Sequence, residues 1–160
     1  MAIIVRDSVR ADVALILRFI GDLAVYEHLE HEVVATAADI ERELFGPRPR
    51  VFCQIAEIDG RPAGFALWYY TFSTFQGRHG IWLEDLFVLP DMRGHGIGKA
   101  LLADLAKRCV RENLGRLEWA VLDWNEPAIG FYQRMGARVM NEWRICRLTG
   151  EALARVASQA

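Results

Sequence analysis

The chain has 160 residues, of which 52% are hydrophobic and 25% are charged, and its formal net charge is −2. This length suits one compact domain with a full core and is short for two, so we expect a single domain over residues 1–160. The charge disfavours nucleic acid and anionic membrane surfaces as partners, and because no apolar window is long enough for a signal peptide or a membrane span, we expect a cytoplasmic protein.

The first part of the chain predicts a strand followed by two helices. Residues 2–7 are mostly apolar and predict a short strand. Asp12 precedes apolar residues spaced three and four apart, which predicts a helix that Asp12 caps and that runs to about Val25. Thr36 and Asp39 have the spacing of a capping box, so a second helix is expected to begin there.

The middle of the chain predicts an antiparallel pair and an internal strand. Residues 51–59 and 63–73 are rich in β-forming side chains. They are joined through Asp59-Gly60, a dipeptide that favours a tight hairpin turn. The apolar run 81–89 is interrupted by two carboxylates and predicts a central strand buried on both faces.

The remaining sequence predicts a βαβ unit, a further helix and a last strand. A helix over 97–113 and a strand over 116–123 follow the apolar run. Another helix begins near Asn125 with Pro127 in its first turn, and residues 138–148 predict the last strand. About seven strands and four helices in this order indicate an α/β (α+β) fold, with a mixed, mostly antiparallel sheet covered by helices on both faces.

A glycine-rich segment, "RGHGIGKA" (Arg93–Ala100), joins the internal strand to the next helix. It does not fit a nucleoside triphosphate loop, because Arg93 stands where a glycine is needed and Ala100 where Ser or Thr is needed. It does not fit the dinucleotide fingerprint, because Lys99 replaces the third glycine. Backbone N–H groups at such a helix start can converge on an anion, while the alternative is a helix start that only needs flexible backbone.

Several separated motifs resemble one family. "LPDMRGHGIGKALL" is similar to the acetyl-CoA pyrophosphate loop of the GNAT superfamily of N-acetyltransferases. "WLEDLFV", "DWNEPAIGFYQRMGA" and "LAVYEHLE" resemble its diamine (spermidine/spermine) acetyltransferase branch, and "FSTFQGRHG" resembles the related thialysine acetyltransferases. The resemblance implies a GNAT-like domain that transfers acetyl from acetyl-CoA to a primary amine, and it implies a homodimer.

The resemblance also implies where acetyl-CoA binds. The backbone of Leu86–Val88 would pair with the pantetheine arm, Gly94–Lys99 would hold the pyrophosphate, and the segment from Asn125 to Ala128 would touch the cosubstrate. An ordinary helix cap and first-turn proline are the alternative for Asn125 and Pro127. The complete implied set is Leu86, Phe87, Val88, Arg93, Gly94, His95, Gly96, Ile97, Gly98, Lys99, Asn125, Glu126, Pro127 and Ala128.

The expected reaction needs a base and an acid. An alkylammonium with a pKa of about 10.4 is almost fully protonated near neutral pH, so a base must take its proton before it attacks. The resemblance gives this role to Glu84, acting directly or through water, with Trp82 and Leu86 expected to bury it and to raise its pKa. It gives Tyr132 the role of protonating the departing thiolate. An outward-facing or ion-paired carboxylate and a core tyrosine are the respective alternatives.

The acceptor is the least determined part of the sequence. The residues that match family positions for amine binding are mostly acidic, which suits a cationic substrate: Tyr26, Glu27, Glu84, Asp85 and Glu142. Ordinary helix-surface charge is the alternative for Glu27. Diamine, polyamine and thialysine or lysine-like acceptors stay open.

Two other classes of function also stay open. One is acetylation of a protein or drug amine, and the other is a non-catalytic acyl-CoA-binding module. We expect direct transfer without an acyl-enzyme, because no motif places any of the three cysteines as an acyl carrier. We expect no metal either, since His28 and His31 lie one helical turn apart without a third ligand at recognisable spacing.

Overall fold

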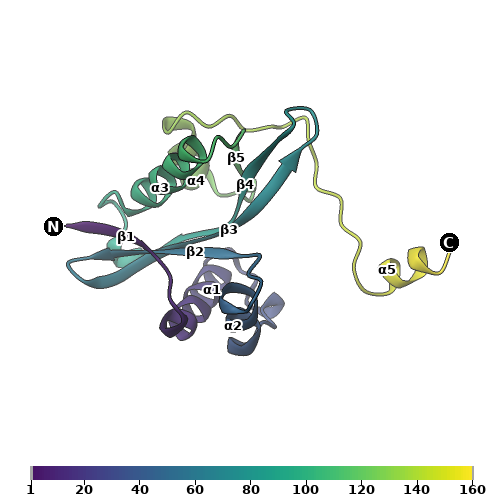
Figure 1. Ribbon diagram of the computed structural model, residues 1–160, viewed down its shortest axis with the longest axis horizontal. Coiled ribbons are helices and arrows are strands. Elements are labelled where there is room, and N and C mark those ends of the chain that lie inside the picture. Colours follow the sequence, from purple (N-terminus) through teal and green to yellow (C-terminus); the bar gives the residue numbers. More distant parts are fainter. Residues whose placement is uncertain (1, 160) are drawn as a thin grey trace. The chain divides into compact units, whose positions relative to one another are not determined.

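The computed structural model describes residues 2–159 and contains one mixed sheet in the order β1-β2-β3-β4-β5. Neighbours from β1 to β4 pair antiparallel, whereas β5 pairs parallel with β4 (Figure 1). The five strands are β1 (Ile3–Asp7), β2 (Phe52–Ile58), β3 (Arg61–Ser73), β4 (Arg78–Val88) and β5 (Leu117–Trp119).

Helices cover both faces of this sheet. Helices α1 (Val13–Glu27) and α2 (Ala37–Phe45) lie against one face, and α3 (Ile97–Arg111) lies against the other (Figure 1). Because α3 joins β4 to β5, these three elements form the predicted βαβ unit. Three short 3₁₀ helices complete the first part of the chain: η1 (Arg10–Asp12), η2 (Glu30–Glu32) and η3 (Pro90–Met92).

The chain divides into two compact units, Met1–Ala120 and Val121–Ala160. The first unit contains the sheet and α1 to α3. The second contains α4 (Glu126–Arg134) and α5 (Gly150–Ala157).

An aromatic group fixes α1 against the sheet. The ring of Phe19 stacks on that of Phe65 at 5.4 Å between centroids and lies 6.3 Å from that of Phe87. All three side chains are buried, so burial of their large apolar surfaces stabilises this contact. The packing holds the middle of α1 to the sheet that carries β4.

A β-bulge interrupts the pairing of β3 with β4. Leu67 pairs with Asp85 and Trp68 pairs with Leu83, so Glu84 is the extra residue on β4. A bulge bends its strand and changes the direction of the neighbouring side chains. The two carboxylates that interrupt the apolar run therefore lie at a local irregularity.

Several local predictions are confirmed. Asp39 N donates to the Thr36 hydroxyl and Thr36 N donates to the Asp39 carboxylate, which forms the capping box. Asp59 and Gly60, with φ of 47° and 78°, turn β2 into β3. Asn125 Oδ1 accepts from the backbone N–H of Ala128 and so caps α4.

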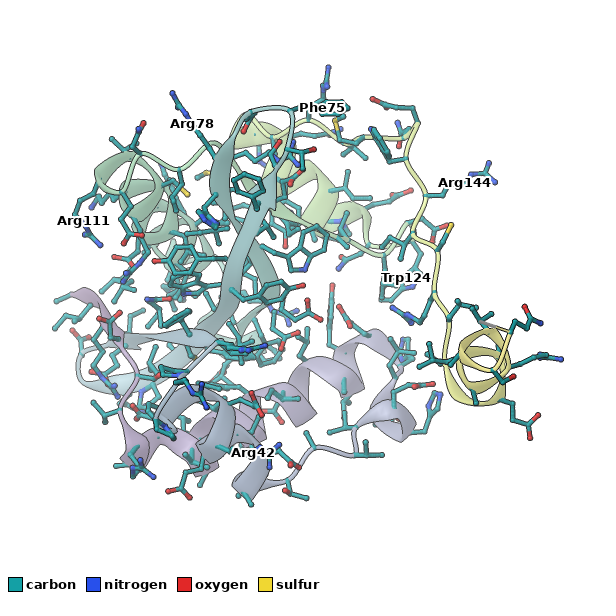
Figure 2. The ribbon with its side chains drawn as sticks, turned by 45° about the vertical axis from the view of Figure 1, so that its right-hand side comes forward. Arg42, Phe75, Arg78, Arg111, Trp124 and Arg144 are labelled. Carbon is teal, nitrogen blue, oxygen red and sulfur yellow. The ribbon has the colours of Figure 1, made fainter. Side chains whose placement is uncertain are left out.

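The α/β class is confirmed, but residues 2–159 contain five strands rather than about seven, and α5 adds a helix to the expected four. The strand expected over 116–123 is confined to Leu117–Trp119, and residues 138–148 form no strand. Trp143 and Ile145 are 74% and 71% exposed, and Figure 2 shows Arg144 projecting from this extended segment. An apolar pattern alone does not make a strand, because a strand also needs a partner for its backbone groups.

The expected cap of α1 is wrong. The Asp12 carboxylate makes no cap bond to α1, because it accepts from the Arg6 guanidinium and from the backbone N–H of Val9. Asp12 therefore ties β1 to η1.

Candidate active site

One edge of β4 is partly unpaired. The ladder between β4 and β5 covers only Ile81–Leu83, although β4 continues to Val88. Within residues 2–159, no strand pairs with Glu84–Val88 on that side. A free strand edge offers backbone donors and acceptors to an extended, amide-bearing ligand. Leu86, Phe87 and Val88 lie on this edge, and the Phe87 side chain is buried in the core.

Two glycines shape the loop that follows. Gly94 and Gly96 have φ of 80° and 86°, a region that side-chain-bearing residues rarely adopt. A Cβ at Gly94 would meet nothing within 4 Å, so the backbone conformation, rather than lack of space, requires glycine there. The loop therefore turns sharply from η3 into α3.

The start of α3 has the properties of an anion site. Gly96 is its N-cap, no described side chain caps it, and its first turn contains no acidic residue. The N–H groups of Ile97, Gly98 and Lys99 precede the first backbone bond of the helix, which Ala100 N donates to Gly96 O. Such donors, together with the helix dipole, favour a negative ligand. The Lys99 side chain is exposed nearby, and His95 Nδ1 lies 3.2 Å from Met92 O.

Arg93 connects the loop to two elements of the first unit. Its Nε donates to Val88 O at 3.1 Å. Its guanidinium carbon lies 4.6 Å from the centre of the Tyr26 ring, on α1, and 5.7 Å from that of Phe87. These are cation–π distances, so Arg93 holds the glycine loop beside the end of α1.

Carboxylates gather on β4 and at the end of α1. Burial, followed by the nearby Glu84 and Glu27 carboxylates, raises the pKa of Asp85 to about 7. Burial also raises the pKa of Glu27. A buried carboxyl beside two other acids favours a cation that neutralises the group.

The expected burial of Glu84 is wrong. Its side chain is exposed, and its Oε2 accepts a hydrogen bond of 2.8 Å from Trp82 Nε1. Glu84 is the bulged residue, and Asp85, which follows it, is half-buried.

Tyr69, on β3, lies close to the Glu84 carboxylate. It was not among the site residues predicted from the sequence. Burial, followed by the neighbouring Glu84 carboxylate, raises its pKa. Tyr69 pairs with Trp82 across β3 and β4. The only sequence signal was an aromatic run at 68–70, which equally fits a core strand.

Six sequence-predicted residues belong to the second unit. Asn125 is buried, and its Oδ1 caps α4 by accepting from the backbone N–H of Ala128. Tyr132 is half-buried on α4, with its ring 5.4 Å from that of Phe131. Glu142 is exposed in the extended segment, Pro127 occupies the first turn of α4, and Glu126 and Ala128 flank it.

Within the described part of the chain, no group of three or more His, Cys, Asp or Glu side chains is arranged to hold a metal ion. His28 ends α1 with φ of 60°, and His31 lies in η2. Among the helices of residues 2–159, none has the length and apolar character needed to cross a membrane.

Comparison with known proteins gives the family. The acetyltransferase (GNAT) family matches residues 18–137. The chain is 33% identical to an L-ornithine N5-acetyltransferase of Arabidopsis thaliana, over 95% of this chain and 86% of that protein. It is 34% identical to a thialysine N-epsilon-acetyltransferase of Bos taurus, over 98% of each chain. A Vibrio cholerae integron cassette protein of known structure superposes with a TM-score of 0.80 at 25% identity, over 98% of each chain. The chain therefore belongs to the GNAT family of acetyltransferases and is an N-acetyltransferase.

Proposed function

We propose that this enzyme transfers acetyl from acetyl-CoA to a primary amine of a small molecule: a diamine, a polyamine or a lysine-like amino acid. One observation carries the proposal. The free edge of β4 is followed, after η3 and the glycine loop, by the start of α3, which no described side chain caps. The same strand carries Glu84 and Asp85. Backbone hydrogen-bond donors for a cosubstrate and carboxylates for a cation therefore lie on the same strand, β4.

The residues present fit acetyl-CoA. The edge at Leu86–Val88 suits the amides of the pantetheine arm. The N–H groups from Gly94 to Lys99 suit the pyrophosphate, with Lys99 as an added positive charge. Arg93 and His95 hold the loop through Val88 O and Met92 O, and the Asn125–Ala128 segment is assigned to the cosubstrate by family resemblance.

The reaction assigns one role to each of two side chains. Glu84 takes a proton from the acceptor ammonium, directly or through water, and the neutral nitrogen forms a bond to the acetyl carbon. The carbon–sulfur bond breaks, Tyr132 gives its hydroxyl proton to the departing sulfur, and the second proton that the nitrogen loses on becoming an amide restores the Tyr132 hydroxyl through solvent. Exposure of Glu84 supports the first role, because a substrate can reach it. Direct transfer without an acyl-enzyme is supported at two of the three cysteines, since Cys53 and Cys109 are buried and burial raises the pKa of both thiols, whereas Cys146 is exposed.

The acceptor site is assigned to Tyr26, Glu27, Glu84, Asp85 and Glu142. Burial of Glu27 and Asp85, with the raised pKa of each, supports a cationic acceptor. The names of the two relatives also support a cationic acceptor, because L-ornithine and thialysine both carry a side-chain amine.

Three further assignments complete the proposal. The whole chain acts as one N-acetyltransferase domain, which is supported by a family match that extends from the first unit into the second, over residues 18–137. The enzyme is a homodimer, which exposed apolar side chains such as Trp143, Ile145 and Leu153 support. It works in the cytoplasm, which the three unpaired cysteines support.

The test is an acetyl-CoA turnover assay with a panel of diamines, polyamines, basic amino acids, peptides and aminoglycosides, read as release of free CoA thiol. Intersecting initial-velocity plots with a small amine are expected for transfer in a ternary complex. An acetyl group found on a cysteine by mass spectrometry would contradict direct transfer. Turnover only with peptides or aminoglycosides would show that the acceptor is a protein or drug amine rather than a small amine. Saturable acetyl-CoA binding without turnover on any amine would show that the protein is a non-catalytic acyl-CoA-binding module.

A further inference from the structure

Glu84 lacks the support that strand pairing gives to its neighbours. It is the extra residue of the β4 bulge, so no residue of β3 pairs with it. Its exposed side chain accepts a hydrogen bond of 2.8 Å from the indole of Trp82, which comes from the same strand. A glutamate held by one such bond keeps part of its rotational freedom, whereas a general base needs a defined direction. A second contact from a neighbouring strand would supply that direction.

Tyr69 is in the place from which such a contact comes. It pairs with Trp82 across β3 and β4, close to the bulge. Alternate side chains of a strand point to opposite faces of the sheet, and the flanking Trp68 and Tyr70 both contact side chains of α3. The Tyr69 side chain therefore lies on the other face, which α1 and α2 cover (Figure 1).

Tyr69 and Glu84 interact through their side chains. Burial, followed by the charge of the Glu84 carboxylate and a side-chain hydrogen bond with it, raises the pKa of Tyr69 above its ordinary value of 10.0. The Tyr69 hydroxyl therefore stays protonated near neutral pH and stays a hydrogen-bond donor. A carboxylate has acceptor capacity for several donors, so Glu84 can accept from β3 and from the Trp82 indole at once.

We propose that Tyr69 is a positioning residue of the reaction: its hydroxyl donates to the Glu84 carboxylate and, with the Trp82 indole, holds it in the orientation that accepts the proton of the acceptor ammonium. This inference rests on the proposed function, because Tyr69 acts only through Glu84. Tyr69 itself exchanges no proton with the substrate.

The loss of a positioning bond should appear in the chemical step. Tyr69→Phe keeps the ring and removes the hydroxyl, so Glu84 spends less time in the reactive orientation while neither substrate loses a contact. In the CoA-release assay, kcat should fall about 10-fold. KM for the amine and KM for acetyl-CoA should each stay within about two-fold of the wild-type values.

Tyr70→Phe is the matched control. Tyr70 is the next residue of β3, and its hydroxyl also donates to a glutamate, Glu112 at the end of α3, at 2.6 Å. The two substitutions thus remove the same kind of bond on opposite faces of the sheet. Each should lower the urea concentration at the midpoint of unfolding, but Tyr70→Phe should leave kcat within about two-fold of the wild type.

A double-mutant cycle separates positioning of Glu84 from a general effect on the fold. Glu84→Gln removes the carboxylate that Tyr69 would hold. Adding Tyr69→Phe to Glu84→Gln should therefore change the residual kcat by less than about two-fold. A tyrosine that contributed only packing would cost the same factor in both backgrounds.

The outcomes separate this inference from the proposed function. A kcat for Tyr69→Phe equal to that for Tyr70→Phe, or an equal loss when Tyr69→Phe is added to the wild type and to Glu84→Gln, would overturn the positioning role and leave amine acetylation by Glu84 standing. Full activity of Glu84→Gln would overturn the assignment of the base and the positioning role with it.

Discussion

The indole Nε1 of Trp82 donates a hydrogen bond of 2.8 Å to Oε2 of Glu84, two residues further along β4. The bond orients a carboxylate that is nevertheless exposed. An oriented and accessible carboxylate is what a general base for a bound ammonium requires. Because Glu84 is the bulged residue of β4, its carboxylate can be held by a hydrogen bond and also be exposed.

Replacing the proposed base should change the pH dependence of the reaction. Glu84→Gln is expected to lower kcat/KM by about 10²- to 10⁴-fold, with the largest loss at low pH, where least of the amine is already neutral. The measurement is kcat/KM from pH 6 to pH 10. Glu118→Gln is the control, because that carboxylate lies on β5 and pairs with Arg116. A pH profile unaltered by Glu84→Gln would place the base elsewhere.

Asp85 should make the folded state less stable as the pH rises. Its pKa of about 7 in the folded protein exceeds the ordinary 3.8, so the folded state holds this proton more tightly than the unfolded state. The stability from this group is fully present below pH 3.8 and is lost as the pH rises through about 7. Asp85→Asn removes the titration. The unfolding free energy of the wild type, measured in urea, should fall relative to the variant by at most about 4 kcal/mol between pH 4 and pH 8.

An exposed carboxyl provides the control for this experiment. Asp91→Asn, in η3, should give a curve parallel to the wild type. If the wild type and Asp85→Asn also run parallel, Asp85 does not titrate in this range.

Two glycines allow backbone strain to be separated from cosubstrate binding. Gly94 and Gly60 have φ of 80° and 78°, and a Cβ at either would meet nothing within 4 Å. Gly94→Ala and Gly60→Ala should each lower the unfolding free energy by about 1–2 kcal/mol. Only Gly94→Ala should also raise KM for acetyl-CoA, by about 10-fold, because it displaces donors at the start of α3. Equal KM values in the two variants would remove the loop from the cosubstrate site.

Tyr132 should affect turnover rather than binding. Tyr132→Phe keeps the ring beside Phe131 and removes the proton donor. We expect kcat to fall about 10²-fold or more, while the dissociation constant for acetyl-CoA, measured by calorimetry, stays within about two-fold. An unchanged kcat would exclude Tyr132 from the chemistry.

Local features of the fold were predictable from the sequence. The capping box at Thr36, the hairpin at Asp59-Gly60 and the cap at Asn125 each depend on residues close together in the chain. The strand, loop and helix around Gly94 and Gly96 were predictable for the same reason.

Features that depend on distant segments were not predictable. The bulge at which Glu84 is exposed and Asp85 is half-buried is set by the register between β3 and β4, which the alternation of residues in one strand does not encode. An open cavity beside Tyr69 is likewise lined by residues of α2, β2 and β3, which lie far apart in the chain. Residues 138–148 have strand-like composition, but composition does not specify a pairing partner.

The free edge of β4 has a consequence for solubility. An unpaired strand edge is where a strand from another molecule can add and begin aggregation. Here the edge is only five residues long, is irregular at Glu84, and carries an exposed negative charge that would meet the same charge on an identical neighbour. The residue that we assign to proton transfer therefore also protects the open edge from pairing with another copy, and Glu84→Gln should make the protein more prone to aggregate at high concentration.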